Sequence, residues 1–284
     1  MTMVVNEIHL LHGLARTMMV AAADRRLTQT DGRYYGTQRK LFPIPYLNGS
    51  ISYFGLAAAE IGGRLFRFSS WLPTFIRRQS GMTDLQAFCT NLRGALHQVL
   101  PPSLLTGTPS GFQVCGYGSL GLPEFWAMSN IGGMEGIEYR DIQPRYGPPM
   151  PDFLGRDAVT LGWDGSDPLS AHCPVPWTYR NGDYRLHIAV WDVVDDALGR
   201  LLALPHATDF RVPNDPRSYG EYVRFKMEFI AYFYKNWARS PTIGRPIDVI
   251  VMTGEYGRGA TLYLDMCHGA TSLRSQMAPR TTRH

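Results

Sequence analysis

The sequence predicts an α+β fold, and the order of its periodic segments carries that prediction. Short β-type apolar runs fill the first 55 residues, and two helical patterns follow them. The same succession of strands and then helices is repeated before a last pair of strands. Helices grouped in this way cover the faces of a sheet, whereas helices that alternate with single strands build a parallel sheet. The pattern therefore indicates a layered α+β domain.

The N-terminal strands are marked by β-branched, aromatic and small apolar residues and by the turns that end them. They are predicted at residues 2–5, 17–23, 39–44 and 50–55. The second strand ends on Asp24, which is followed by Arg25 and Arg26, so a buried run leads directly to a carboxylate. Such a carboxylate is either an ordinary residue where the chain leaves the core or part of a site.

From Leu56 the apolar spacing becomes helical, and a helix is predicted from there to Gln79, with Pro73 starting or kinking a turn. Thr83 is the predicted N-cap of a second helix, which Pro101 ends. Strands are then predicted at 111–117 and 123–129, helices at 184–204 and 218–238, and strands at 246–253 and 260–265.

A chain of 284 residues with 44% hydrophobic residues can bury a large core, and this length allows either one large domain or two; we expect a single domain over residues 2–284. Residues from about 131 to 183 are rich in Gly, Pro and Asp. So long an irregular stretch predicts an insertion with a role of its own. The basic residues from about 273 to 284 predict a flexible tail.

Charge and cysteine patterns exclude several classes of function. The net charge of +4 comes from Lys and Arg scattered along the chain, without the clustered stripe typical of nucleic-acid binding. No apolar run reaches the ~18 residues of a membrane span, and Asn6, Glu7 and Arg16 interrupt the N-terminal stretch that mimics a signal peptide. The four cysteines form no C-x-x-C pair. We expect a cytoplasmic protein with reduced thiols and with no metal ion, cofactor, nucleic-acid or membrane partner.

The candidate chemistry lies at the N-terminus. Met1 is normally removed before a small second residue, which would leave Thr2 as the mature N-terminus. A terminal threonine is both nucleophile and base, because its hydroxyl attacks while its own α-amine, with an unperturbed pKa of about 7.7–8.0, takes the proton. An ammonium group such as Lys40 would lower the pKa of that amine, and Asp24 would hold the lysine. The backbone N–H of Gly55 is a candidate oxyanion donor, because a strand is predicted to pass into a helix there.

These residues resemble those of the proteasome β-type N-terminal-nucleophile hydrolases, which include HslV and the bacterial Anbu proteins. That family has an N-terminal Thr, a strand ending in A-D-x-R, a K-x-x-x-I-like strand and a glycine before its first helix. Thr2, "AAADRR", "RKLFPI" and "YFGLAAAE" are similar to these features. The similarity extends over roughly residues 2 to 129 and 184 to 265.

The resemblance implies a four-layer αββα sandwich and a threonine peptidase or amidase. The catalytic residues that it implies are Thr2, Asp24, Lys40 and Gly55. It also implies that Tyr53 and Ala57 flank the glycine in the substrate pocket, which a bulky Tyr53 would make shallow. The expected partners are a peptide or protein substrate and further copies of the chain in a ring or a dimer of rings, while an ATPase partner is left open.

Alternatives remain for both the site and the function. Arg39 could occupy the position of the active-site lysine if the register of the strand is shifted by one residue. Family members also serve as inactive structural subunits, so a scaffold or assembly protein is the second function. An acyl transferase or ligase is the third, because it shares the acyl-enzyme formed at Thr2.

Other polar residues are given structural roles. The late stretch "ARSPTIGRP" offers only Ser240 and Thr242 as counterparts of the family's supporting residues. Lys226 is predicted to be a charge at the rim of a buried helix, and His9 and His187 to be surface residues or satisfied core residues.

Overall fold

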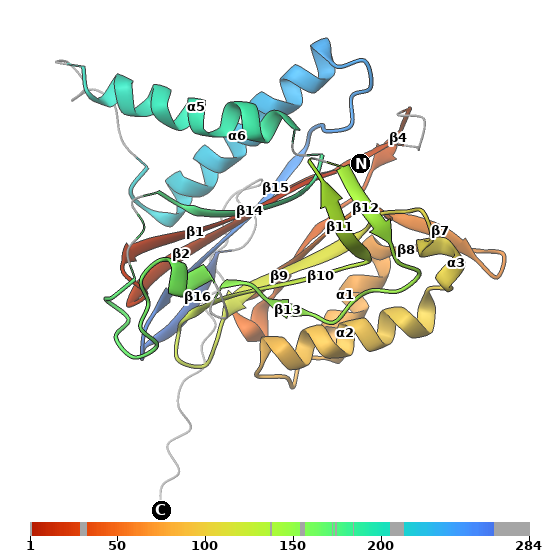
Figure 1. Cartoon of the computed structure of the whole chain (residues 1–284), viewed down its shortest axis with the longest axis horizontal. Helices are drawn as coiled ribbons and strands as arrows, with labels where there is room; N and C mark the ends of the chain where they lie inside the picture. The colour runs from red at the N-terminus through yellow and green to blue at the C-terminus, as the bar shows by residue number, and fades with distance from the viewer. Residues whose placement is uncertain are drawn as a thin grey trace, which may run out of the picture.

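The computed structural model describes residues 2–28, 33–136, 138–153, 157–171, 173, 175–183, 185–204 and 213–263. Within these ranges, two five-stranded sheets lie face to face and helices cover their outer faces (Figure 1). The groups of strands and the long helices follow one another in the predicted order, with further strands among them, so the α+β prediction is confirmed.

The first sheet carries the N-terminal strand. Its strand order is β14-β1-β2-β15-β16, and neighbouring strands are antiparallel. The bounds are Met3–His12 (β1), Arg16–Asp24 (β2), Trp177–Gly182 (β14), Ile247–Glu255 (β15) and Gly259–Tyr263 (β16). The register of β1 and β2 pairs Val4 with Ala23, so Thr2 and Asp24 come to the same end of this sheet.

The second sheet has the order β13-β10-β9-β6-β5 and is also antiparallel. Its strands are Leu41–Ile44 (β5), Gly49–Phe54 (β6), Gly111–Tyr117 (β9), Pro123–Ser129 (β10) and Met150–Pro151 (β13). Lys40 directly precedes β5 and Gly55 directly follows β6, so both lie at one end of the β5–β6 hairpin.

The described residues also form two-stranded sheets and short helices outside the two large sheets. The two-stranded sheets pair Arg26–Thr28 (β3) with Tyr34–Thr37 (β4), Ala58–Ile61 (β7) with Arg64–Arg67 (β8), and Ile131–Glu135 (β11) with Glu138–Ile142 (β12). The short helices are Pro45–Leu47 (η1), Pro102–Leu105 (α3) and Ala158–Thr160 (α4).

Two pairs of longer helices cover the sheets. Helices α1 (Phe68–Arg78) and α2 (Leu85–Val99) pack on the second sheet, and α5 (Arg185–Leu202) and α6 (Pro216–Trp237) lie over the first. The N-cap of α2 is Asp84, whose side chain accepts a hydrogen bond from the Ala87 N–H at 2.6 Å. The prediction of Thr83 as N-cap is therefore wrong by one residue.

The apolar side chains gather in three clusters of the described residues. Successive side chains of a strand point to opposite faces of its sheet. Val4 and Ile8 of β1 accordingly enter the cluster between the sheets, whereas Met3 and Val5 enter the cluster under α5 and α6.

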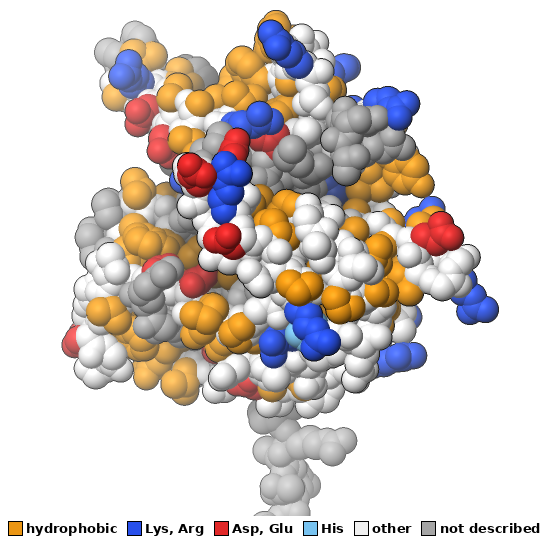
Figure 2. Space-filling view, turned by 45° about the vertical axis from the view of Figure 1, so that its right-hand side comes forward, with side chains coloured by type: hydrophobic (Ala, Val, Ile, Leu, Met, Phe, Trp, Pro, Cys, Tyr) orange, Lys and Arg blue, Asp and Glu red, His pale blue; other side chains and the backbone are white. Residues whose placement is uncertain are grey.

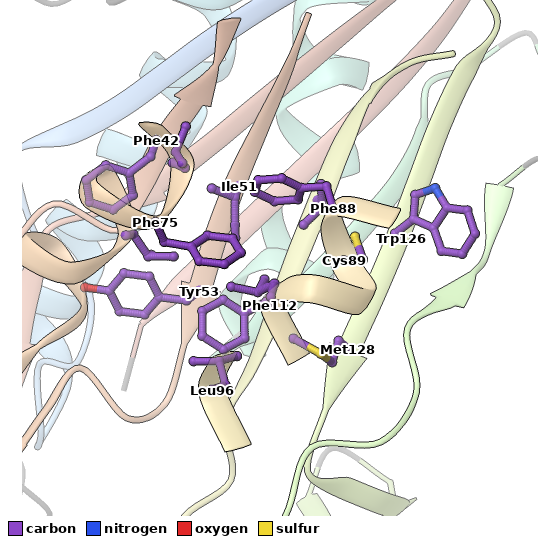
Figure 3. Close-up of a cluster of buried hydrophobic side chains, with 14 of the residues drawn as sticks. Phe42, Ile51, Tyr53, Phe75, Phe88, Cys89, Leu96, Phe112, Trp126 and Met128 are labelled. Atoms are coloured by element: carbon purple, nitrogen blue, oxygen red, sulfur yellow. The ribbon is translucent and has the colours of Figure 1, made fainter. Parts of the chain in front are cut away.

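The third cluster lies between the second sheet and helices α1 and α2. Figure 3 shows its aromatic rings, which come from both the helices and the strands. Ring centroids are 5.5 Å apart for Phe75 and Phe88, and 6.2 Å apart for Tyr53 and Phe112. The aromatic ring of Tyr53 is thus held by the core of the second sheet.

The helix predicted to start at Leu56 is wrong over its first half, because residues 58–67 form the β7–β8 hairpin and α1 starts only at Phe68. Ala and Glu are good helix formers, but Gly62-Gly63 follows them. Two glycines between two strands close a tight hairpin turn and interrupt a helix, and this local signal decides the outcome.

The described residues within 131–183, the predicted insertion, contribute a strand to each of the two large sheets. β14 forms the edge strand beside β1, β13 pairs with β10, and β11 and β12 form a separate hairpin. The predicted tail at about 273–284 lies outside the described residues.

Lys and Arg side chains occur in separate groups on the face of the molecule in Figure 2, with hydrophobic and uncharged side chains between them. Among the helices that the structure describes, none combines the length and the apolar character of a membrane span.

Candidate active site

Thr2 is held at the end of the first sheet by a backbone hydrogen bond to its own carbonyl oxygen and by a side-chain hydrogen bond to the next residue, Met3. Its carbonyl oxygen accepts a hydrogen bond from the Asp183 N–H, just beyond β14, at 2.7 Å. On the other side, the Met3 N–H donates to Asp24 Oδ1 at 2.8 Å. The threonine is 2% exposed, so its position is set by the sheet rather than by solvent.

Asp24 is fully buried at the end of β2 and collects several donors. Besides the bond from Met3, its Oδ2 accepts hydrogen bonds from the Arg26 N–H at 3.0 Å and the Gly244 N–H at 3.4 Å. Oδ1 also lies 3.4 Å from the Lys40 ammonium. Burying a carboxylate without such donors is costly, and the apolar β2 strand brings this one into the interior.

Lys40 connects this carboxylate with the threonine. Its Nζ, on a side chain 2% exposed, contacts Thr2 Oγ1 directly and donates to the Arg26 carbonyl oxygen at 2.5 Å. Burial lowers the pKa of Lys40 below its ordinary value, and the charge of Asp24 acts in the opposite direction. A lysine in this environment releases its proton more readily than a surface lysine.

Arg39 takes a different direction from Lys40. Its Nε donates to the Leu41 carbonyl oxygen at 2.8 Å, and its guanidinium lies 5.5 Å from the centroid of the Phe42 ring. Of these two neighbours in the sequence, Lys40 is the one that contacts Thr2.

A cavity of about 310 Å³ opens beside the threonine. It brings together residues that are far apart in the sequence. The lining residues are Thr2, Leu27, Thr28, Tyr35, Lys40, Tyr53, Phe54, Gly55, Leu56, Ala57, Ala58 and Thr108. Five of the six residues suggested by the sequence therefore line one cavity, and the sixth, Asp24, lies behind Lys40.

Tyr53 closes part of this cavity in a fixed orientation. Its hydroxyl donates to the Arg39 carbonyl oxygen at 3.0 Å and accepts a hydrogen bond from Gln38 Nε2 at 2.9 Å. Burial raises the pKa of Tyr53 well above its usual value, so the hydroxyl stays neutral at any working pH.

Gly55 occupies a position that no other residue could take without strain. Its φ is +81°, and a Cβ atom there would lie 2.0 Å from the Pro109 carbonyl oxygen. The expectation of a helix N-terminus at this glycine is wrong, because β7 follows and α1 begins at Phe68. Any contribution of Gly55 to binding an anion therefore comes from its backbone N–H without a helix dipole.

Asp183 is the residue near Thr2 that the sequence analysis missed. Besides its backbone bond to Thr2, its carboxylate accepts hydrogen bonds from Arg185, from the Tyr234 hydroxyl at 2.6 Å and from the Thr242 hydroxyl at 2.5 Å. Thr242, one of the two late candidates, thus contacts Asp183. The dipeptide Gly-Asp directly before a helical pattern is the signal that could have identified this position.

A second polar cluster lies on the outer face of the first sheet, under α5 and α6. Glu7 accepts hydrogen bonds from Trp191 Nε1 at 2.7 Å and Lys226 Nζ at 3.1 Å, and it also pairs with His9 at 3.0 Å. Burial alone would raise the pKa of Glu7, but His9, Lys226 and Trp191 together lower it to about 2. The prediction of Lys226 as a rim charge is wrong, since its side chain is 2% exposed.

His187 is buried beside this cluster, with its ring stacked 4.4 Å from that of Trp191. Neither ring nitrogen has a hydrogen-bond partner among the residues that the structure describes, so the prediction of a surface or satisfied histidine is wrong. Burial, followed by the charge of Arg180, lowers the pKa of His187 to about 3. His9, in contrast, has Glu7 as its partner.

Within the described ranges, no group of three or more His, Cys, Asp or Glu side chains is arranged to hold a metal ion. The polar groups around Thr2 include the Lys40 ammonium, the Asp24 carboxylate, the threonine's own hydroxyl and backbone N–H groups. This set of groups is suited to acid–base and nucleophilic chemistry.

No protein-family model matches the sequence, and no curated protein matches it. Among solved structures, the chain is similar to Anbu (ancestral beta-subunit) from Yersinia bercovieri, with a TM-score of 0.44 and 11% identity, covering 88% of this chain and 81% of that one. It is also similar to the Anbu (Gly-1) mutant from Hyphomicrobium sp. strain MC1, with a TM-score of 0.45 and 12% identity, covering 97% of this chain and 90% of that one. This is a structural similarity to Anbu at low sequence identity.

Proposed function

We propose that the chain is an N-terminal threonine hydrolase, a proteasome-like peptidase or amidase in which removal of Met1 exposes Thr2 as the nucleophile. The observation that carries the proposal is the contact between the Lys40 ammonium and the Thr2 hydroxyl at the wall of a cavity, with Asp24 behind the lysine. A buried lysine is costly, and a structural role alone is served as well by an apolar side chain. A titratable group with a lowered pKa beside a cavity is typical of a catalytic site.

In the acylation step, the α-amine of Thr2 accepts the proton of its own hydroxyl, and Oγ1 forms a bond to the carbonyl carbon of the substrate amide. The carbonyl oxygen becomes an oxyanion, which accepts a hydrogen bond from the Gly55 N–H. The protonated amine then gives its proton to the leaving nitrogen as the C–N bond breaks. An ester on Thr2 and a free amine product result.

Lys40 acts on the nucleophile in this scheme. Its positive charge stabilises the negative charge that develops on Thr2 Oγ1 and lowers the pKa of the neighbouring α-amine, which favours the neutral base. Asp24 holds the lysine in place. In the free enzyme, the rate of acylation therefore rises with pH as the α-amine loses its proton.

Water completes the cycle when the α-amine takes one of its protons and the oxygen attacks the ester carbonyl carbon. The amine then returns that proton to Oγ1 as the ester C–O bond breaks, which releases the acid and restores Thr2 with a neutral amine. An amine in place of this water gives acyl transfer, the third function. The apolar lining of the cavity by Leu27, Leu56 and Ala58 suits an apolar side chain next to the scissile bond of a peptide.

The proposal includes the four-layer αββα arrangement of the N-terminal-nucleophile hydrolases and a homo-oligomeric state. Native mass spectrometry tests the second point. The mass of a single chain, which is 31.9 kDa before Met1 is removed, at all protein concentrations would contradict it.

The test of the nucleophile combines an intact-mass measurement with covalent labelling. A peptide epoxyketone reacts with both the hydroxyl and the α-amine of an N-terminal threonine, so peptide mapping of the labelled protein identifies the residue. We expect loss of Met1, one label per chain at Thr2, and no label in Thr2→Ala. Thr261→Ala removes an exposed hydroxyl far along the sheet and is the matched control, which keeps the label.

Two results would overturn the proposal. A label that persists in Thr2→Ala would show another nucleophile. Retained Met1, or a processed wild-type chain that takes no label, would favour the scaffold function. The products formed with and without an added amine then separate hydrolysis from transfer.

A further inference from the structure

The β11–β12 hairpin reaches the end of the first sheet at which Thr2 lies. Figure 1 shows it in green beside the mark of the N-terminus. Its strand β12 carries Tyr139, a partly buried side chain that packs against the cluster between the two sheets. The hairpin belongs to the segment 131–183, to which the proposed catalytic scheme gives no role.

The hydroxyl of Tyr139 is bonded to the residue that lies against Thr2. It accepts a hydrogen bond from the Gly182 N–H at 2.8 Å. The hydroxyl in turn donates to the Gly182 carbonyl oxygen or to Asn181 Oδ1, each of which lies 3.3 Å away. A Cβ atom on Gly182 would be 1.7 Å from the Thr2 carbonyl oxygen, so the two backbones touch. The next residue, Asp183, donates its N–H to that same oxygen at 2.7 Å.

The ring of Tyr139 contacts the opposite sheet. Its centroid is 5.9 Å from that of Phe54, with an angle of 30° between the ring planes. Phe54 lines the cavity and directly precedes Gly55, the proposed oxyanion donor. Tyr139 therefore contacts Gly182, which lies against Thr2 in the first sheet, and Phe54, which precedes Gly55 in the second sheet.

We infer that Tyr139 is a positioning residue, which sets the distance between the Thr2 hydroxyl and the Gly55 N–H by joining Gly182 to Phe54. This inference rests on the proposed function of Thr2. The nucleophile and the oxyanion donor belong to different sheets, and each sheet is rigid within itself through its own hydrogen-bond ladder. The rate of acyl transfer is sensitive to the distance between these two groups, because a displacement of about 1 Å can lower the rate about a hundredfold.

Tyr139→Phe tests the inference because it removes the hydroxyl and keeps the ring against Phe54. We expect the maximal rate of epoxyketone labelling to fall by roughly tenfold to a hundredfold. The probe concentration for half-maximal rate stays unchanged, because Tyr139 does not line the cavity. Tyr139→Ala removes both contacts and lowers the rate further.

Tyr179→Phe is the matched control. Tyr179 also joins the two sheets, through a ring stacked 3.7 Å from that of Phe125, and its hydroxyl donates to Asp157 at 2.6 Å. It lies three positions before Gly182 on β14, away from Thr2. A general loss of sheet packing would slow labelling in both variants, whereas loss of positioning slows it only in Tyr139→Phe.

The outcomes separate the inference from the proposed function. If the wild-type chain is labelled at Thr2 and Tyr139→Phe is labelled at the same rate, the inference is wrong and the proposed function stands. Equal slowing in Tyr179→Phe, or slowing that follows a lowered melting temperature, also overturns the inference. If the processed wild-type chain takes no label, the proposed function fails and the positioning role fails with it.

Discussion

Lys40 and Arg39 are neighbours in the chain, but only the lysine faces Thr2, and this difference can be measured. We expect Lys40→Ala to lower the rate of acylation by roughly a hundredfold or more, because it removes the positive charge beside the developing Oγ1 anion. Arg39→Ala should reduce the rate only slightly, since its guanidinium bonds a backbone carbonyl and covers a ring. Labelling kinetics of both variants, with melting temperatures, provide the comparison.

Lys40→Arg sharpens this prediction. Arginine keeps the positive charge but is larger and holds its proton at all accessible pH values. In a site where the lysine is 2% exposed, the larger group should displace Thr2 and leave the variant as slow as Lys40→Ala. Normal labelling of Lys40→Ala, or a stronger loss in Arg39→Ala, would contradict the assignment.

At the residue scale, the sequence could suggest the groups that meet near Thr2 but not all the residues that hold them in place. Asp24 and Lys40 follow or precede apolar strands, and such positions lie at sheet ends in any layered fold. Asp183 and Tyr139 contact Thr2 and its neighbour across large separations in the chain. Their placement depends on how β14 and the β11–β12 hairpin dock, which no local pattern encodes.

Helices α5 and α6 are joined to β1 by a buried ion pair. Lys226 of α6 lies 3.1 Å from both Glu7 of β1 and Asp195 of α5, and its ammonium is 4.1 Å from the centroid of the Trp191 ring. One side chain thus links three elements. The amphipathic pattern of α6 indicates a buried face but does not show that a charge lies within it.

We expect Lys226→Met to destabilise the protein by about 3–5 kcal/mol, because Glu7 keeps its charge in the core and loses one of its partners. The double variant Glu7→Gln, Lys226→Met should recover much of this loss, since it removes both charges. Lys235→Met, an exposed position on the same helix, is the control and should change little. Urea unfolding measures all three variants. A single variant as stable as the wild type would mean that the pair contributes little.

At the element scale, the strands and long helices were predictable because their apolar periodicity is strong. Strands β9 and β10 have the predicted bounds, at residues 111–117 and 123–129. The β7–β8 hairpin was missed because alanines favoured a helix, although the Gly62-Gly63 turn lay within the same stretch. Turn residues outweigh propensity in so short a segment, since a two-residue loop needs them and a helix does not.

For the whole molecule, the burial of side chains on both faces of β1 and β2 requires a second sheet on one side and helices on the other. Both faces of these strands are buried and largely apolar, so the first sheet must be covered on each side. The sequence indicates this double burial through its continuous apolar runs. It does not indicate which helices cover which sheet, because that depends on the path of the connecting segments.

Buried His187 makes the stability of the whole fold sensitive to mild acid. Its pKa is lowered from 6.5 to about 3, first by burial and then by Arg180, with Lys226 acting in the same sense and Glu7 against it. Between these two pH values the unfolded chain binds a proton at this histidine that the folded chain does not. The free energy of unfolding therefore falls as the pH falls below 6.5.

The prediction is a loss of roughly 2 kcal/mol between pH 6.5 and pH 5 that depends on His187, because each pH unit in this window costs about 1.4 kcal/mol. His187→Phe keeps a ring against Trp191 and cannot bind a proton, so its stability should change less over the same window.

His97, whose pKa is also lowered, chiefly by burial, contributes equally in both proteins and cancels in the difference. Glu7 has a pKa of about 2 and an unfolded value of 4.5, so its own contribution is lost only at lower pH. Urea unfolding of both proteins at pH 5, 6 and 7 measures the effect, and parallel pH profiles would show that His187 binds its proton normally in the folded state.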